Sequence, residues 1–240
     1  MFFKKKKDGP VTPKLAREQF CCIIEENSAD VKKTYHVIAD ESKYTLLYRD
    51  GRFLGLPQPH GGPIYPFSDD PRKAGNNGQK KKFTYAKVVC LSKDFNLKIF
   101  WGTKTPFVIE DPVTKKAYEV GAHGEFYIQI DPTDAASSAD KFYSKCLTQG
   151  DANNFDTTQL RDFLTAAFIM RVGAKIQDYI EEKGTSLETY VGLTPKEMLK
   201  ISNEICPRLR DVFAEYGVTV VESTSADSIL QGLNVKEASR

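Results

Sequence analysis

The chain has few of the residues that metal or thiol chemistry requires, with five cysteines and three histidines among 240 residues. The cysteines form no C-x-x-C pair, and no histidine lies near one of them in the sequence. Zinc sites use closely spaced Cys and His ligands, and disulfide frameworks use an even set of cysteines. We therefore expect no metal site, no disulfide framework, and reduced thiols typical of a cytosolic protein. The cysteines are Cys21, Cys22, Cys90, Cys146 and Cys206.

Long apolar runs are missing as well. No stretch approaches the roughly 18 uninterrupted apolar residues that a transmembrane helix needs. The N-terminal MFFKKKKDGP has no apolar stretch behind its charges, so we expect that it is not a signal peptide. The net charge of +2 is too small for a dedicated nucleic-acid binder, which gathers Lys and Arg on one face. We expect a cytoplasmic protein that binds no nucleic acid and contacts membranes only peripherally.

Motifs for catalysis and cofactor binding are also lacking. There is no G-x-S-x-G elbow to accompany His60–Gly62, no G-x-x-x-x-G-K-[ST] loop and no G-x-G-x-x-G. One nucleophile arrangement stays open, in which Cys21 or Cys22 acts with His36 or His123. Free cysteine is more often a small buried residue, however. We predict no catalytic residue, no metal ligand and no cofactor.

What the sequence does contain is a run of strand patterns over residues 20–130. Asp50-Gly51 separates two apolar runs and predicts a tight hairpin, because glycine accepts the positive φ that the turn needs. Apolar residues alternate over 95–101, which predicts a strand with one buried face. We also expect a long loop at 57–80, a hairpin turning at 111–114 and a strand at 124–130.

The later part of the chain has helical periodicity. We expect a short helix over 135–147 and a longer one from Thr157, whose apolar stripe follows spacings of three and four. A third helix begins at Thr194-Pro195, where Glu197 completes a capping box. Pro207 should bend or split that helix near Ile205, and Gly217 should end it. The stripe of the longer helix is Leu160, Phe163, Leu164, Ala167, Phe168, Val172, Ile176, Tyr179 and Ile180.

The predicted fold is α+β, with an antiparallel β-rich N-terminal part followed by amphipathic helices and one returning strand. We divide the chain into a flexible basic arm, one domain and a frayed tail. The arm is 1–16, the domain is 17–230 (17–131 mostly β, 132–217 mostly helical, 218–223 strand), and the tail is 231–240.

The stretch Trp101-Gly102-Thr103-Lys104 follows the strand at 95–101. A catalytic loop would need a general base or nucleophile, and this stretch offers only a lysine and a threonine. We predict a structural turn in which Trp101 anchors the corner in the core and Gly102 permits a bend.

The order of motifs resembles the SPFH/Band 7 domain of the stomatin–prohibitin–flotillin group, most closely its soluble bacterial virion-core-protein-like branch. The likeness spans about residues 20–230. It implies a non-enzymatic scaffold or assembly module that binds protein partners and copies of itself. The matching segments are Gly51-Arg52-Phe53-Leu54-Gly55, Trp101-Gly102-Thr103-Lys104, Gly124 to Pro132, and Tyr216-Gly217-Val218-Thr219-Val220.

Two other functions stay open. One is an enzyme whose site is assembled in space under the 57–80 loop. A pocket near that loop that holds a carboxylate or histidine of shifted pKa would support this alternative. The other is a β module that binds a small ligand in an apolar cavity. An assembly protein should instead carry an exposed apolar patch or an unpaired sheet edge. The helix stripe from Thr157 supplies such a patch if it is wider than the sheet it covers.

The N-terminal arm is the candidate membrane contact. Its residues are Phe2, Phe3, Lys4, Lys5, Lys6 and Lys7. Each lysine near an anionic bilayer contributes about 1 kcal/mol, and the two phenylalanines can enter the interface. The alternative is an arm that stays in solution.

Deleting residues 1–8 should therefore abolish any salt-sensitive binding to anionic liposomes, because the lysines supply the attraction. Liposome co-sedimentation measures this, with neutral liposomes as the control. Binding that survives the deletion would show that another surface is the anchor.

Overall fold

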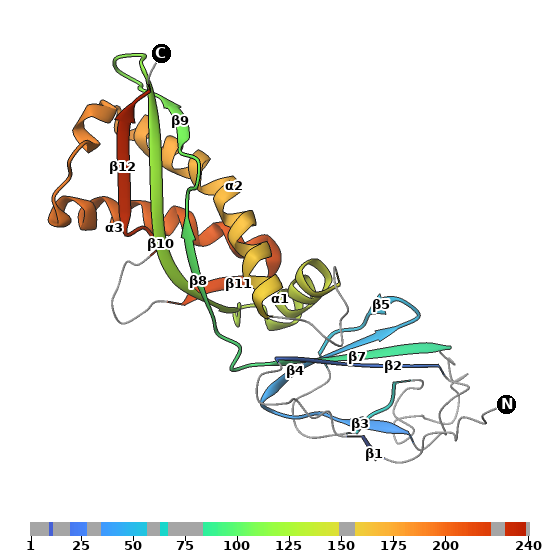
Figure 1. Ribbon diagram of the computed structural model, residues 1–240. Helices are drawn as coiled ribbons and strands as arrows, with labels where there is room; N and C mark the ends of the chain where they lie inside the picture. The colour runs from blue at the N-terminus through green and yellow to red at the C-terminus, as the bar shows by residue number, and fades with distance from the viewer. Residues whose placement is uncertain are drawn as a thin grey trace. The chain divides into compact units, whose positions relative to one another are not determined.

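The structure is a computed structural model that describes most of the chain (Figure 1). The described residues are 10–11, 20–27, 35–56, 63–66, 84–148, 157–221 and 229–238. Sheets come first, and helices with the returning strand β11 (Val218–Val221) follow, so the fold is α+β as predicted. The chain forms two compact units, one of Met1–Phe95 with Ile130–Phe155 and one of Asn96–Gln129 with Asp156–Arg240. We call them unit 1 and unit 2.

Unit 1 contains two sheets and a helical segment. The larger sheet is antiparallel with the strand order β2-β7-β4-β5, and the smaller has the order β1-β3-β6 with β1 and β3 parallel. The elements are β1 Pro10–Val11, β2 Cys21–Asn27, β3 His36–Ile38, β4 Lys43–Arg49, β5 Arg52–Phe53, β6 Pro63–Ile64, β7 Tyr85–Ser92, α1 Ala135–Phe142 and the π-helix η2 Tyr143–Leu147.

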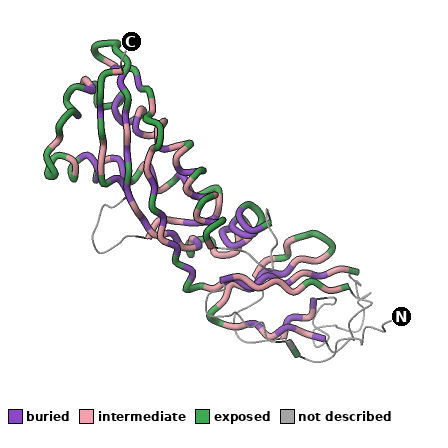
Figure 2. The backbone as a smooth tube through the Cα atoms, viewed as in Figure 1, coloured by how far each residue is buried: buried purple, intermediate pink, exposed green. Residues whose placement is uncertain are grey.

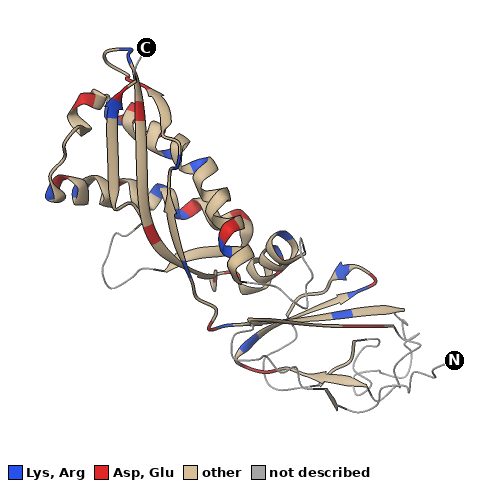
Figure 3. Cartoon of the chain, in the orientation of Figure 1, with Lys and Arg blue, Asp and Glu red and all other residues tan. Residues whose placement is uncertain are grey.

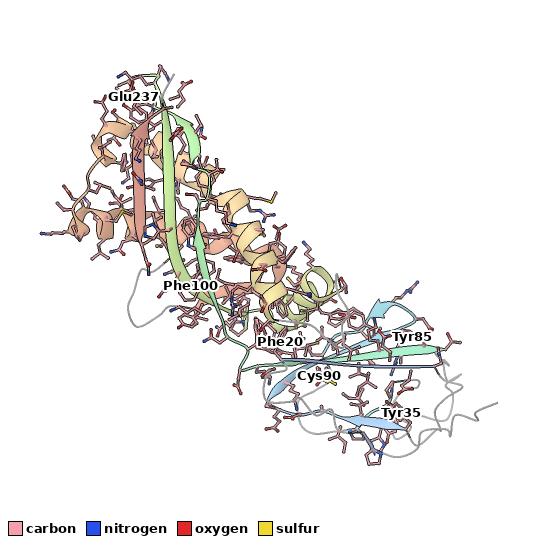
Figure 4. The ribbon with its side chains drawn as sticks, viewed as in Figure 1. Phe20, Tyr35, Tyr85, Cys90, Phe100 and Glu237 are labelled. Carbon is pink, nitrogen blue, oxygen red and sulfur yellow. The ribbon has the colours of Figure 1, made fainter. Side chains whose placement is uncertain are left out.

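The larger sheet of unit 1 is covered on both faces. Leu47 and Cys90 pack with Tyr35 in a cluster that joins the two sheets (Figure 4). Tyr48 follows Leu47, so its side chain points to the opposite face, where its hydroxyl donates to Asp140 of α1 at 2.5 Å. Unit 1 is thus layered as small sheet, large sheet and helix.

The predicted hairpin at Asp50-Gly51 is confirmed. These two residues join β4 to β5 with φ of 46° and 78°, and Arg49 lies opposite Arg52. Positive φ at both central residues matches the twist of a two-residue hairpin. The Asp50 carboxylate also accepts from the backbone N–H of Tyr85 at 3.0 Å, which ties the turn to β7.

Unit 2 is built around the strand β10 (Figure 1). We predicted a hairpin strand and a separate strand at 124–130, but one strand runs without a break from Ala117 to Ile130. The intervening residues stay extended because they pair on both sides, Gly121 with Asn234 and His123 with Gly102. The elements are β8 Leu97–Gly102, β9 Phe107–Glu110, β10 Ala117–Ile130, α2 Thr157–Lys183, 3-10 helix η3 Leu187–Tyr190, α3 Pro195–Arg210, 3-10 helix η4 Asp211–Tyr216, β11 Val218–Val221 and β12 Gly232–Glu237.

An aromatic cluster fills the core of unit 2. The Phe168 ring from α2 lies 4.8 Å from Trp101 of β8, 5.0 Å from Phe126 of β10 and 5.4 Å from Phe213 of η4, between ring centroids. Aromatic pairs in such arrangements contribute about 0.5–1.5 kcal/mol beyond their buried area. The cluster therefore fixes α2 and η4 onto the inner face of the sheet.

Helix α2 uses its apolar stripe for this core. Every residue of the predicted stripe is buried except Phe163, which is half-buried and packs edge-on against Tyr216. Figure 2 shows buried positions recurring along the helix. The stripe is therefore used within unit 2 and leaves little surface for association with another molecule.

Helix α3 begins as predicted, with a complete capping box between Thr194 and Glu197 and proline at the first turn. Of the two predicted effects of Pro207, the split is wrong, since the helix continues to Arg210, and the bend near Ile205 stays a prediction. Pro207 lies on the exposed face of α3, while Ile205 on the other face is buried and keeps the helix on the core. The 3-10 helix η4 then ends at Gly217 with φ of 70°, which confirms that stop.

The ends of the chain differ from the expectation where they are described. The predicted frayed tail contains β12, which pairs with β10 over six residues and buries Val235. The sequence of β12 gave little signal because only Leu233 and Val235 are apolar in it. In the predicted flexible arm, Pro10–Val11 forms β1 against His36 and Val37, and residues 1–9 lie outside the described residues.

We predict that Gly173→Ala lowers the free energy of unfolding by about 1–3 kcal/mol, the usual cost of overpacking. A Cβ at Gly173 in α2 would lie 2.7 Å from Cδ1 of Phe107 in β9, so the ring has to move. At an open helix position the same change would stabilise the protein by up to about 1 kcal/mol.

Urea denaturation of both single variants and of Gly173→Ala/Phe107→Ala closes a double-mutant cycle. Alanine at 173 should become neutral or stabilising once the Phe107 ring is gone. A Gly173→Ala protein that is more stable than the wild type would contradict the contact.

Candidate functional site

Trp101 holds the segment that leads into β12. Its side chain is only 5% exposed, and the indole Nε1–H donates to the Ile229 carbonyl at 2.7 Å. Ser202 of α3 donates to the next carbonyl, that of Leu230, also at 2.7 Å. Two side chains from different elements therefore fix the backbone immediately before β12.

The rest of the Trp101–Lys104 stretch closes β8 onto β10. Thr103 donates its N–H to the Ala122 carbonyl at 2.9 Å, and its hydroxyl accepts from the Ala122 N–H at 3.0 Å. Gly102 differs from our expectation, because it lies within β8 opposite His123 and not in a bend that needs glycine. A Cβ there would meet His123 Cβ at an ordinary 3.5 Å. Lys104 is exposed beside this corner.

The candidate membrane contacts Phe2, Phe3 and Lys4–Lys7 lie outside the described residues, as does most of the 57–80 loop. The predicted membrane contact and the predicted lid therefore stay predictions. Within the described part of the chain, no helix has the length and apolar character needed to cross a membrane.

The paired cysteines lie on opposite faces of β2. Cys22 packs against the cluster between the two sheets, opposite Cys90. Burial, together with the neighbouring thiols, raises the pKa of Cys21 to about 12, and burial also raises the pKa of Cys22. Both thiols therefore stay protonated near neutral pH, whereas a nucleophilic cysteine needs the thiolate.

A polar network lies on the α1 face of the large sheet in unit 1. Lys87 of β7 pairs with Glu25 of β2 at 2.5 Å and donates to the Tyr143 hydroxyl at 3.0 Å. Nearby, the Tyr48 ring lies 5.4 Å from that of Tyr143 while its hydroxyl donates to Asp140. The network fastens α1 and η2 to the sheet.

The charge states in this network suit a structural role, holding α1 and η2 on the sheet, more than proton transfer. Burial alone would lower the pKa of Lys87, but its interactions with Glu25 and Tyr143 have a larger effect and raise that pKa. Burial and the bond to Asp140 raise the pKa of Tyr48. Neither group is poised to exchange a proton near pH 7, which a general acid or base must do. No three described His, Cys, Asp or Glu side chains come together as metal ligands.

A buried carboxylate joins two distant segments of unit 2. Asp111, in the turn between β9 and β10, is fully buried. Its Oδ1 accepts from the N–H groups of Val113 and Thr114, both at 2.7 Å. Its Oδ2 accepts from the Ser186 hydroxyl at 2.7 Å and the Leu187 N–H at 2.6 Å. One side chain thus accepts hydrogen bonds from both the β9–β10 turn and the start of η3.

These four donors determine the charge of Asp111. Burial alone would raise its pKa, but the hydrogen bonds from Thr114, Ser186, Leu187 and Val113 outweigh burial and hold the pKa well below its ordinary value. The carboxylate stays ionised with its lone pairs engaged, which suits a structural anchor.

An apolar groove opens on unit 2 between α3 and the start of β12. Its volume is about 410 Å³, and it is open to solvent. Leu199 on its wall is 50% exposed. The lining residues are Leu193, Pro195, Met198, Leu199, Ser202, Leu230, Gln231, Gly232 and Leu233.

Beside this groove, β12 is an edge strand of its sheet, and η3 packs against part of it. Among the described residues β12 pairs only with β10, and no strand is drawn on its other side in Figure 1. An unpaired strand presents a row of N–H and C=O groups that can accept another strand. The edge and the groove together form the surface that we call the β12 edge site.

Sequence analysis missed this site. Met198 belongs to the predicted third helix and was not singled out as a site residue, yet it is half-buried and lines the groove, and Leu230 and Leu233 fell in or next to the expected tail. The available signal was the alternation of Leu233, Asn234 and Val235, which is typical of a strand but short.

No protein-family model matches the chain, and no curated protein matches it either. The resemblance to the SPFH/Band 7 domain therefore stays a prediction that rests on its motifs.

Asp111→Asn should lower the free energy of unfolding at pH 7 by about 1–3 kcal/mol, because an amide cannot accept from all four donors. A carboxyl group whose pKa is lowered by folding contributes its full stability above its ordinary value of 3.8 and loses it as the pH falls further. The variant should therefore lose less stability between pH 5 and pH 3 than the wild type does.

Urea denaturation across that pH range measures both effects. Asp134→Asn is the matched control, because Asp134 is an exposed N-cap of α1 and asparagine caps about as well. An Asp111→Asn protein with wild-type stability and pH dependence would contradict the anchor role.

Proposed function

We propose that the chain is a non-enzymatic assembly module that binds protein partners through unit 2. The observation that carries the proposal is the β12 edge site, in which a strand edge unpaired among the described residues lies beside a solvent-open apolar groove. Peptide segments commonly bind by adding a strand to such an edge, with side chains seated in adjacent pockets.

The ionisable groups of the described residues support a binding module over an enzyme. The Lys87 network and Asp111 are each engaged in holding elements together. Their pKa shifts move them away from neutrality, whereas catalytic groups are tuned toward the working pH.

The wider setting follows from the resemblance to SPFH/Band 7 domains. In that setting the module acts as a cytoplasmic scaffold, peripheral to a membrane, with the basic arm Lys4–Lys7 as its anchor. Self-association is part of the same proposal and would use other exposed apolar side chains, such as Val108 at 68% and Met170 at 84% exposure.

Selection of a random dodecapeptide display library on the full chain tests partner binding. Peptides should be enriched on the wild type and should bind Leu199→Asp at least about tenfold more weakly, because the change puts a charge on the groove wall. Leu199 is half exposed, so the fold should tolerate the substitution.

Val113→Asp is the matched control, because Val113 is 58% exposed in the β9–β10 turn and does not line the groove. It should bind like the wild type, and circular dichroism should show both variants folded. A selection that enriches no peptide would overturn the proposed function.

A further inference from the structure

We propose that the β12 edge takes up an extended, acidic segment of a partner protein as an added strand. This inference rests on the proposed function and specifies the partner's chemistry. The occupant has apolar side chains at alternate positions and carboxylates near them.

The register of β12 identifies the backbone groups that face outward. Ala238 donates its N–H to the Ala117 carbonyl across the ladder. Bonded and non-bonded pairs alternate in antiparallel sheets, so the even-numbered residues of β12 face β10. The N–H and C=O groups of Leu233, Val235 and Glu237 are left on the outer edge, where Val235 is buried and Leu233 and Glu237 are more accessible.

This edge is held in place before anything binds. Trp101 and Ser202 fix the carbonyls of Ile229 and Leu230, and the ladder to β10 fixes the strand itself. A preorganised edge avoids part of the ordering entropy that association otherwise costs.

The groove matches the side chains of an added strand. Alternate residues of a strand point to the same face, and a strand beside β12 would point one set toward the wall formed by Leu193, Met198 and Leu199. Apolar side chains at alternate positions therefore gain burial there.

The charges on α3 favour carboxylates in the occupant. On a helix, residues three or four apart lie on one face, so Lys196 lies next to both Leu199 and Lys200, all three of them exposed, although neither lysine lines the groove itself. No ion pair joins either lysine to another described residue, although Lys200 acts weakly on Glu204. Figure 3 shows Lys and Arg positions on α3 near its N-terminal end.

The carboxylates of α3 are already engaged. Glu197 accepts from the Thr194 hydroxyl at 2.6 Å in the capping box. Glu204 pairs with Lys183 at 2.6 Å and accepts from Tyr179. Glu197 keeps its negative charge in the capping box, so Lys196 and Lys200 leave a net positive charge on this part of α3, which favours acidic residues over basic ones.

A second copy of β12 fits this rim less well than an acidic segment does. Its sequence Gly232–Glu237 has one acidic residue, Glu237, and that side chain already pairs with Lys116 at 3.2 Å. It also carries Lys236, which would approach the α3 lysines. Charge complementarity thus selects a partner protein over self-pairing.

The test uses the most enriched peptide from the dodecapeptide selection, labelled with fluorescein and titrated with the full chain in fluorescence anisotropy. N-methylation is moved along the peptide one residue at a time. Only alternate N–H groups of an added strand bond to β12, so the loss of affinity should alternate, roughly tenfold at every second position.

Charge is tested separately with Lys196→Glu/Lys200→Glu. This variant should weaken binding roughly tenfold at low salt and less at high salt, because two exposed attractions become repulsions. Lys104→Glu, on the exposed turn after β8, is the matched control and should leave binding unchanged.

The outcomes separate the two proposals. If no peptide is enriched, the proposed function fails. Three results would contradict only the proposal of an added acidic strand and leave the proposed function standing. They are peptides enriched in Lys and Arg, affinity losses on N-methylation that do not alternate, or an unchanged affinity in the double lysine variant. Self-association that Leu199→Asp abolishes, with no preference for acidic peptides, would identify a second copy as the occupant. Alternating losses with the expected charge response support the inference.

Discussion

The pairing of β10 is the constraint on which unit 2 depends, because the other four strands of its sheet all pair with this one strand. Its residues alternate strictly between buried and more exposed positions along fourteen residues. A shift of one residue would turn Tyr118, Val120 and Phe126 toward solvent and bring Glu119 and Glu125 into the core. The aromatic cluster around Phe168 therefore holds the register of the whole sheet, and with it the position of β12.

The proposed binding surface follows from the same arrangement. The register of β10 determines which groups of β12 face outward, and Trp101 and Ser202 determine where β12 begins. The Trp101 indole, at the end of β8, thus holds a segment that is far away in the sequence. Helix α3, capped at Thr194, supplies both the apolar wall and the positive rim. Packing inside unit 2 therefore fixes the geometry of a surface that is exposed to solvent.

Features with local causes could be predicted from the sequence. The Asp50-Gly51 turn, the alternation over 95–101 and the capping box at Thr194 each depend on residues a few positions apart, and the α+β class follows from their order. Features with distant causes could not be predicted. The donors to Asp111 come partly from the start of η3, and β12 becomes a strand only because β10 offers it an edge. The candidate site combines both kinds, so its helix was found and its strand was missed.

Because β12 lies near the end of the described chain, it can pair with β10 only late in synthesis. His123 is synthesised roughly 110 residues before its partner Gly232. At about 5–20 residues per second, the edge of β10 that pairs with β12 therefore stays without this partner for several seconds during translation. Unit 1 has all its described elements by Leu147 and can fold during this interval. A nascent chain therefore lacks β12, and the proposed partner binding can begin only once translation has passed Glu237.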